Sequence, residues 1–228
     1  MSGGKRPLDL LRSLAIQETS ISPTFHHVEM YTAGGLLTLL WHGDRTEDRY
    51  VLMGAGAMGG LLGPADGLYH DLGVTLAEQG IGAVRVGYRQ PNELEACVLD
   101  MAVAGDLASR AGGERFVTMG HSFGGAVAVG CGVALPSHVV GVVTLSTQSA
   151  GCEQAGRLAG KKLLLVHGDR DELLPVMCSE VVNELAGGHG EIVVLPGAGH
   201  LLNQGDTGEV LRRRLLEWIP GVLESPAG

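Results

Sequence analysis

A serine with a glycine two positions to each side is the first group in this chain that could do chemistry. Residues 120–124 read Gly-His-Ser-Phe-Gly and lie between two apolar segments, RFVTMG and FGGAVAVGCGVAL. The pattern G-x-S-x-G is typical of a nucleophile elbow, in which a sharp strand-to-helix turn exposes the serine hydroxyl. Glycine makes up 37 of 228 residues, so the bare pattern is weak, but its setting between a strand-like and a helix-like segment is what an elbow needs. We take Ser122 as a candidate nucleophile, with a purely structural turn as the alternative.

A serine hydroxyl needs a base to remove its proton and a carboxylate to orient that base. Two later apolar segments end in suitable residues: KLLLVHG is followed by Asp169, Asp171 and Glu172, and EIVVLPG is followed by His200. Asp171 is favoured over Asp169, because an aspartate in a turn often bonds the backbone two residues on, and Glu172 is the third choice. Of the nine histidines, only His200 follows the last strand-like segment. The expected group is therefore Ser122, Asp171 and His200.

Strand-like and helix-like segments alternate along the chain and must position these residues. Strands are expected at 27–32, 36–42, 49–56, 81–88, 115–120, 139–145, 162–168 and 191–197, and helices at 66–79, 93–110, 123–135, 175–187 and 205–219. Continuously apolar strands that alternate with helices indicate an α/β fold, with a mostly parallel central sheet of about eight strands and helices on both faces. Ligand sites in such sheets lie at the carboxyl ends of the strands, so the three candidate residues could meet there.

The division of the chain is simple. We expect residues 1–24 to form a short helix, over about 8–17, and a linker, and residues 25–228 to form one domain. Only about 16 residues separate the strands expected at 139–145 and 162–168. That connection is too short for a sizeable cap domain, so the site should be open.

Three motifs together resemble the α/β-hydrolase fold, in its small dienelactone-hydrolase-like or serine esterase branch. They are GHSFGGA, HGDRDELLP and PGAGH, and the resemblance covers about residues 25–220. It implies a nucleophile, an acid and a base at Ser122, Asp171 and His200, in the chain order of that fold. In that family the acid lies three residues after the glycine of a His-Gly pair, and Gly168 plus three is Asp171.

The resemblance also implies an oxyanion hole, in which two backbone N–H groups stabilise the negative charge that acyl transfer places on a carbonyl oxygen. Phe123, directly after the nucleophile, supplies one donor, and the loop after the 49–56 strand supplies the other. In similar hydrolases this loop begins His-Gly, whereas Met53-Gly54 stands here. The second donor is then Ala55, with Ala57 as the second choice and a bare tight turn as the alternative.

The same loop satisfies a second pattern, because Gly54, Gly56 and Gly59 spell G-x-G-x-x-G after a strand. This is a dinucleotide fingerprint only where it opens a helix directly and an acidic residue ends the next strand. Gly63-Pro64 interrupts any helix here, and Arg89 rather than an acid follows the next strand. We therefore expect no nucleotide cofactor.

Two polar residues are candidates for contacts with a substrate. Gln148 lies just after the 139–145 strand, where it could line the pocket or cap the strand. Arg89 could bind a substrate carboxylate through its guanidinium fork. Pairing with an acid of the following helix is the more frequent role of an arginine in that position.

Composition limits the partners. The net charge of −9 argues against nucleic acid or an anionic membrane as a partner. No run of about 18 apolar residues is present to span a bilayer. The four cysteines form no C-x-x-C pair, and no signal-peptide cleavage site follows the N-terminal apolar stretch, so we expect a cytoplasmic protein with reduced thiols.

The combined expectation is a serine hydrolase that cleaves a small ester or thioester through an acyl-enzyme, with no metal and no organic cofactor. Two alternatives stay open: a hydrolase-fold protein that only binds a partner, and an acyltransferase that uses the same three residues. A homodimer would be a common way to cover an open site.

Overall fold

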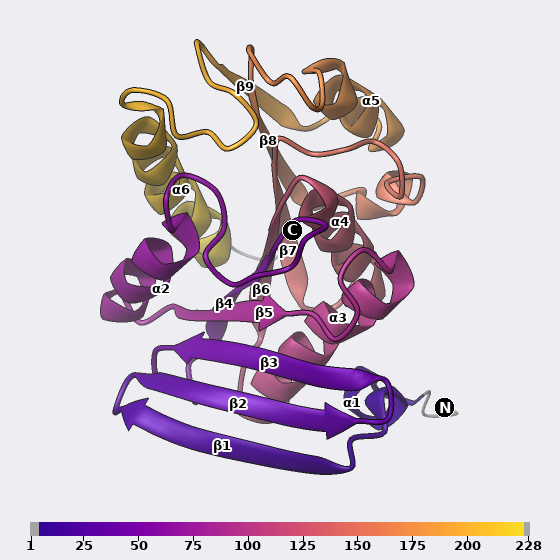
Figure 1. The fold of residues 1–228 in the computed structure, drawn as a ribbon, viewed down its shortest axis with the longest axis vertical. Coiled ribbons are helices and arrows are strands. Elements are labelled where there is room, and N and C mark those ends of the chain that lie inside the picture. Colours follow the sequence, from indigo (N-terminus) through magenta and orange to yellow (C-terminus); the bar gives the residue numbers. More distant parts are fainter. Residues whose placement is uncertain (1–4, 226–228) are drawn as a thin grey trace.

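The computed structural model describes residues 5–225, which form a nine-stranded sheet with helices on both faces (Figure 1). The strands are β1 (Ala15–Ser22), β2 (Phe25–Thr32), β3 (Gly35–His42), β4 (Arg49–Gly54), β5 (Gly82–Gly87), β6 (Arg115–His121), β7 (Val139–Leu145), β8 (Lys162–Gly168) and β9 (Glu191–Leu195). The helices are α1 (Pro7–Leu11), α2 (Leu68–Glu78), α3 (Leu94–Arg110), α4 (Phe123–Ala134), α5 (Met177–Leu185) and α6 (Thr207–Glu224), with a 3-10 turn, η1, at Ala155–Leu158.

The sheet has the order β1-β2-β3-β5-β4-β6-β7-β8-β9. Strands β4 to β9 run parallel, and β1, β2 and β3 form an antiparallel meander that joins them through β5. The mostly parallel α/β sheet expected from the sequence is confirmed. Because all six parallel strands end at the same edge, the loops that follow them gather there.

The N-terminal segment differs from the expectation of a helix over 8–17 followed by a linker. The helix ends at Leu11, since Arg12 takes a left-handed conformation with a φ of 52°, and residues 15–22 pair with β2 as an additional strand. Strand β1 is exposed along nearly its whole length, so its side chains show no burial period that would mark a strand. Backbone hydrogen bonds to β2 define it instead, which is why about eight strands were expected where nine occur.

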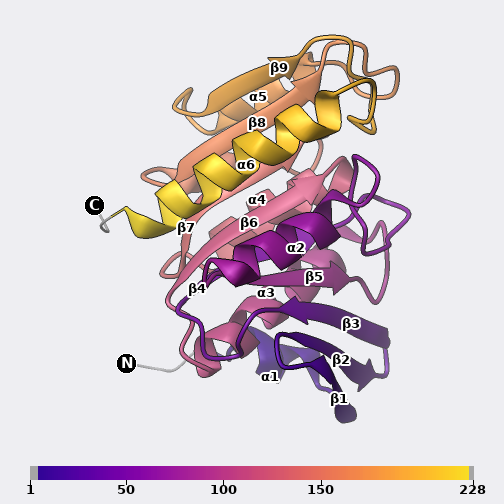
Figure 2. The ribbon, with the colours of Figure 1, turned by 90° about the vertical axis from the view of Figure 1, so that its left-hand side faces the viewer.

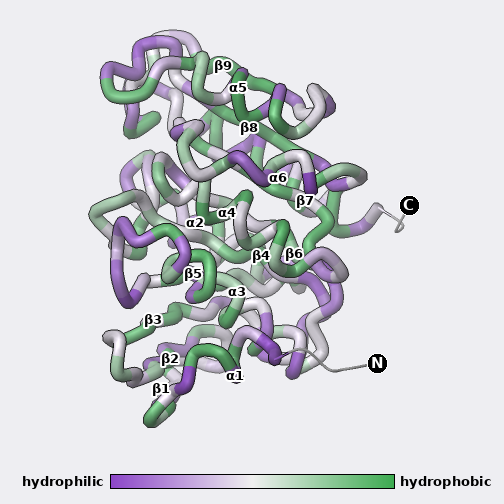
Figure 3. The backbone as a smooth tube through the Cα atoms, turned by 90° about the vertical axis from the view of Figure 1, so that its right-hand side faces the viewer, coloured by the Kyte–Doolittle hydropathy of each residue, from purple (hydrophilic) through white to green (hydrophobic). Residues whose placement is uncertain are grey.

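Two apolar cores form because alternate side chains of each strand point to opposite faces. On one face, Val51 and Met53 of β4 pack with α2 and α6, and on the other face Tyr50 and Leu52 pack with α3 and α4. Figure 2 shows α2 and α6 in front of the sheet and the other helices behind it. Hydrophobic segments gather in the strands, and many hydrophilic ones lie in the peripheral loops (Figure 3).

The connection between β7 and β8 contains only η1, so no cap domain is inserted there. Within residues 5–225, no helix has both the length and the apolar character needed to cross a bilayer. The edge where the parallel strands end is therefore the place to look for a site.

Candidate active site

Strand β6 runs into helix α4 with a single residue, Ser122, between them. Its backbone has a φ of 56° and a ψ of −121°, a region that residues other than glycine rarely occupy. The Ser122 N–H donates to the Leu145 carbonyl at 2.8 Å, and the Ser122 carbonyl accepts from the Gly125 N–H at 2.9 Å. These bonds hold the strained turn, which is the conformation of a nucleophile elbow.

The two glycines of the motif are required by close backbone packing. A Cβ atom on Gly120 would overlap the carbonyl of Gly124, and a Cβ atom on Gly124 would overlap the carbonyl of Ala55. The second contact also shows that the loop after β4 lies directly against the elbow. Gly56 of the same loop is close to Ser122, because a Cβ built on it would lie 3.7 Å from the Ser122 Cβ.

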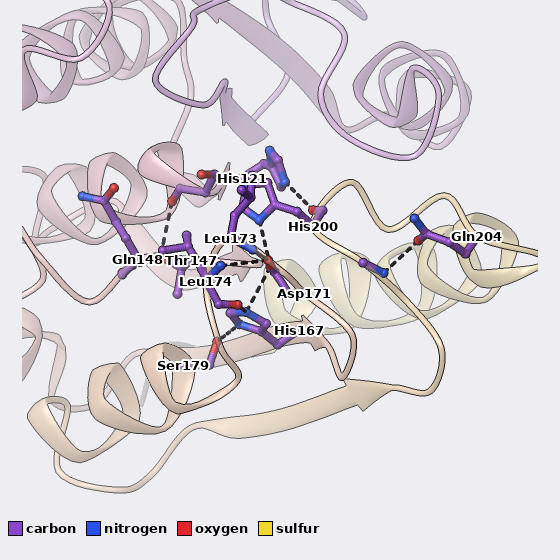
Figure 4. Close-up of polar contacts among 12 residues, drawn as sticks. His121, Thr147, Gln148, His167, Asp171, Leu173, Leu174, Ser179, His200 and Gln204 are labelled. Atoms are coloured by element: carbon purple, nitrogen blue, oxygen red, sulfur yellow. Dashed lines mark hydrogen bonds and ion pairs between the residues drawn. The ribbon is translucent and has the colours of Figure 1, made fainter.

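The expected acid and base are paired. His200 Nδ1 lies 2.8 Å from Asp171 Oδ2 (Figure 4), and Asp171 Oδ1 accepts hydrogen bonds from the backbone N–H groups of Leu173 at 2.9 Å and Leu174 at 2.8 Å. The carboxylate is fully buried, whereas the imidazole is 13% exposed. The acid therefore fixes the ring through Nδ1 and leaves Nε2 as the nitrogen that can receive a proton.

The charge of Asp171 follows from competing effects. Burial raises the pKa of its carboxyl, but the hydrogen bonds from the Leu174 N–H, from His200 and from the Leu173 N–H together lower the pKa below its usual 3.8. Asp171 is thus ionised at neutral pH and can stabilise a positive imidazole.

His121, the residue before Ser122, binds the backbone of His200. Its Nε2 lies 2.8 Å from the His200 carbonyl oxygen, and the two imidazole rings have centroids 4.8 Å apart. Burial lowers the pKa of His121 to about 4, so the ring is neutral at pH 7 and must carry its proton on Nε2 to donate to that carbonyl. The sequence places His121 beside the serine, but its bond to the His200 backbone depends on a loop 79 residues away.

Among residues 5–225, no hydrogen bond joins the Ser122 hydroxyl to His200. Such a bond is often long in unliganded enzymes and shortens when substrate binds. The structure brings the acid and the base together and fixes the base next to the residue that precedes the serine.

A second histidine lies behind the acid. His167 is fully buried, with Nε2 2.9 Å from the Leu174 carbonyl and 3.3 Å from Asp171 Oδ2, and Nδ1 2.8 Å from Ser179 Oγ (Figure 4). A carbonyl only accepts, so His167 Nε2 carries a proton and supports the carboxylate from the side opposite His200. The His-Gly pair at the end of β8 was the only sign of this residue in the sequence.

The two expected oxyanion donors have free backbone N–H groups. Phe123 is the first residue of α4 and has no intrahelical partner, and Ala55 follows the last residue of β4. In the part of the chain that the structure describes, neither N–H donates to another backbone or side-chain group. Beyond Ala55 the loop forms a tight turn, with the Gly59 N–H donating to Gly56 at 2.9 Å, and Ala57 lies inside it.

The remaining candidates are engaged elsewhere. Arg89 Nε lies 2.5 Å from Asp100 Oδ1 of α3, as the alternative interpretation of this arginine expected, so its guanidinium already has a buried partner. Gln148 Nε2 donates to the Ala150 carbonyl at 2.8 Å. Asp169 accepts the N–H of Gly197 at 2.6 Å, 28 residues along the chain, and the bond to the backbone two residues on that was expected for it is made by Asp171 instead, with the Leu173 N–H.

A cavity of about 540 Å³ adjoins the base. His200 lines it together with Leu173 and Leu201, and Arg170 and Gln204 add polar groups. The two leucines are 72% and 54% exposed, so the cavity opens to solvent, and its lining on the loops after β8 and β9 is mixed, with Glu172 among the polar residues. Within the described residues, no three His, Cys, Asp or Glu side chains are arranged to hold a metal ion.

The architecture is similar to that of several solved structures with the α/β-hydrolase fold. A dienelactone hydrolase from Anabaena variabilis superposes with a TM-score of 0.73 at 15% identity, over 92% of this chain and 99% of that one. Est1E from Butyrivibrio proteoclasticus gives 0.71 at 14% identity, over 87% and 99%. An alpha-beta serine hydrolase homologue from Coxiella burnetii gives 0.63 at 18% identity, over 87% and 99%.

No family model matches the sequence, and no curated protein matches it. The similarity to solved structures at these identities establishes the fold, and the expected α/β-hydrolase fold is confirmed.

Proposed function

We propose that this protein is a serine hydrolase that cleaves small carboxylic esters or thioesters. The observation that carries the proposal is the ionised Asp171 paired with His200 beside the strained turn at Ser122. An imidazole fixed through Nδ1 is suited to act as a general base at Nε2. The similarity to dienelactone hydrolase and to a serine hydrolase homologue supports the same chemistry.

In the proposed mechanism, Ser122 Oγ attacks the carbonyl carbon while His200 Nε2 takes the hydroxyl proton. The Asp171 carboxylate stabilises the imidazolium, and the N–H groups of Phe123 and Ala55 stabilise the oxyanion. The bond to the leaving alcohol or thiol then breaks, and His200 returns its proton to that group. Water, deprotonated by His200, attacks the acyl-enzyme, and the acid and the free serine are released.

The open edge of the sheet, where the parallel strands end, suggests the size of the substrate. No domain is inserted between β7 and β8, and the cavity beside His200 offers two leucines, Leu173 and Leu201, for contact with the apolar part of a substrate. We therefore expect short-chain esters to be better substrates than long-chain ones.

The test is a panel of p-nitrophenyl esters with acyl chains of two to twelve carbons, measured with wild type, Ser122→Ala and Ser20→Ala. Ser20 lies on exposed strand β1, far along the chain from the site, and serves as the matched control. We expect Ser122→Ala to lower kcat/KM by about 10³-fold or more, and Ser20→Ala to leave it unchanged.

Labelling by a fluorophosphonate probe is the second measurement, because it requires an activated serine. We expect rapid labelling at Ser122 in wild type. A wild type that neither labels nor hydrolyses any ester would overturn the proposal in favour of a binding protein, and activity that persists in Ser122→Ala would overturn the assigned nucleophile.

A further inference from the structure

One buried hydroxyl contacts the strand end that carries the second expected oxyanion donor. Tyr69, the second residue of α2, is fully buried, and its hydroxyl donates to the Gly54 carbonyl at 2.9 Å. Gly54 ends β4 and directly precedes Ala55, so this phenol binds the peptide that carries the second expected oxyanion donor.

The bond to Gly54 fixes the direction of the next N–H. The Gly54 carbonyl and the Ala55 N–H belong to the same planar trans peptide, in which the two groups point in opposite directions. When the carbonyl points toward Tyr69, the Ala55 N–H must point away from it. The orientation of this candidate oxyanion donor is therefore set by a side chain that does not itself reach the site.

The surroundings leave the phenol little freedom. The Tyr69 N–H donates to the Leu62 carbonyl at 3.0 Å, and Gly63, with a φ of 73°, packs so closely that a Cβ there would overlap the ring. On the other side of the peptide, a Cβ on Gly54 would overlap the hydroxyl of buried Tyr88. The peptide between Gly54 and Ala55 is thus held from two sides.

We propose that Tyr69 is a positioning residue that orients the Ala55 N–H as an oxyanion donor. Donors of this kind act by being aimed in advance at the position where charge develops, so a small rotation of the peptide weakens them. The expected effect on catalysis rests on the proposed function. The expected orientation of the Ala55 N–H rests only on the hydrogen bond from Tyr69 to the Gly54 carbonyl.

The first test compares Tyr69→Phe with Tyr50→Phe. Tyr50 is a matched control, because it is also fully buried and its hydroxyl donates to a backbone carbonyl, that of Asp44, at 3.2 Å, but it lies at the opposite end of β4. We expect Tyr69→Phe to lower kcat for p-nitrophenyl acetate by about 10- to 100-fold with KM within about twofold, since loss of a whole donor costs about 10²- to 10³-fold. Tyr50→Phe should keep kcat within about twofold, and an equal loss of kcat in both variants overturns the proposal.

The second test does not depend on hydrolysis. The residual dipolar coupling of the Ala55 N–H bond, measured by NMR, reports its orientation. We expect this coupling to change in Tyr69→Phe and to stay at the wild-type value in Tyr50→Phe. An unchanged coupling in Tyr69→Phe overturns the inference whether or not the protein hydrolyses esters, whereas a changed coupling in a chain without esterase activity supports Tyr69 and removes only the proposed function.

Discussion

Both oxygens of the Asp171 carboxylate accept hydrogen bonds that the proposed mechanism requires. Oδ1 accepts two backbone N–H groups from the loop that follows it, and Oδ2 meets His200 on one side and His167 on the other. An amide in its place keeps the shape but presents a donor where an acceptor is required. The ring of His200 would then lose the tautomer that leaves Nε2 free to accept a proton.

Asp171→Asn should therefore lower kcat by about 10³- to 10⁴-fold, as expected when the orienting acid of such a group becomes an amide. Steady-state hydrolysis of p-nitrophenyl acetate measures the loss. Asp169→Asn is the control, because Asp169 is exposed and its carboxylate accepts a hydrogen bond from the Gly197 backbone N–H. A loss of similar size in the two variants would contradict the role given to Asp171.

The same residue gives a prediction about acid stability. Because the native pKa of Asp171 lies below the unfolded value of about 3.9, its charge contributes stability that is present above that value and is lost as the pH falls through the native pKa. The difference in unfolding free energy between wild type and Asp171→Asn should therefore shrink between pH 6 and pH 2. Urea titrations at several pH values measure it, and a difference that stays constant over this range would show that the native pKa is not lowered.

At the scale of single residues, the sequence indicates the site residues that follow apolar strands. It does not indicate residues whose role depends on a hydrogen bond to a backbone carbonyl. Asp171 and His200 could be predicted because each follows an apolar strand in an order that suits the chemistry. Tyr69 could not, because its partner is the Gly54 carbonyl, and every residue has a carbonyl. His121 and His167 could not for the same reason, since each binds a backbone oxygen contributed by another loop.

At the scale of elements, the elbow depends on how closely strand β6, helix α4 and the loop after β4 approach one another. Gly124→Ala would push a methyl group into the Ala55 carbonyl. We expect this variant to lose thermal stability by the roughly 1–3 kcal/mol typical of an overpacked site. It should also label with a fluorophosphonate at least about tenfold more slowly, because the loop after β4 moves with Ala55, the proposed oxyanion donor.

Gly221→Ala is the control for that substitution. Gly221 lies in α6 with open space where a Cβ would stand, so alanine there should stabilise the protein by about 0.5–1 kcal/mol and leave labelling unchanged. Thermal unfolding and labelling rates check both variants. Wild-type labelling in Gly124→Ala would mean that the contact with Ala55 does not position the loop.

The elements themselves were predictable where burial imposes a pattern. Strands β4 to β8 are largely apolar because helices cover both of their faces, whereas the edge strand β9 is partly exposed, and the expected ranges match β4 to β9 closely. Strand β1 was not predictable, because it is an edge strand whose side chains are exposed on both faces. Only its hydrogen bonds to β2 make it a strand, and those have no signal in local hydrophobicity.

At the scale of the whole molecule, two buried histidines make the fold sensitive to mild acid. Burial is the main cause that lowers the pKa of both His42 and His121 to about 4. Both pKa values lie below the unfolded value of about 6.5, so between pH 6.5 and pH 4 the unfolded chain binds protons that the native protein does not. The free energy of unfolding should consequently fall as the pH drops through this window, by up to about 1.4 kcal/mol per pH unit for each of the two histidines.

His42→Leu tests this dependence without touching the proposed site. His42 lies on β3 against Phe25 and Gly73, and its Nε2 has no hydrogen-bond partner within the described chain, so leucine removes a titrating group that also faces His70 and Arg85. Urea unfolding of wild type and variant at pH 4.5, 5.5, 6.5 and 8 should give a shallower pH dependence for His42→Leu below pH 6.5. Above pH 7.5 the two curves should run parallel, since both histidines are then neutral in the native and the unfolded states. Identical slopes between pH 4.5 and 6.5 would mean that His42 takes up its proton in the folded protein as readily as in the unfolded chain.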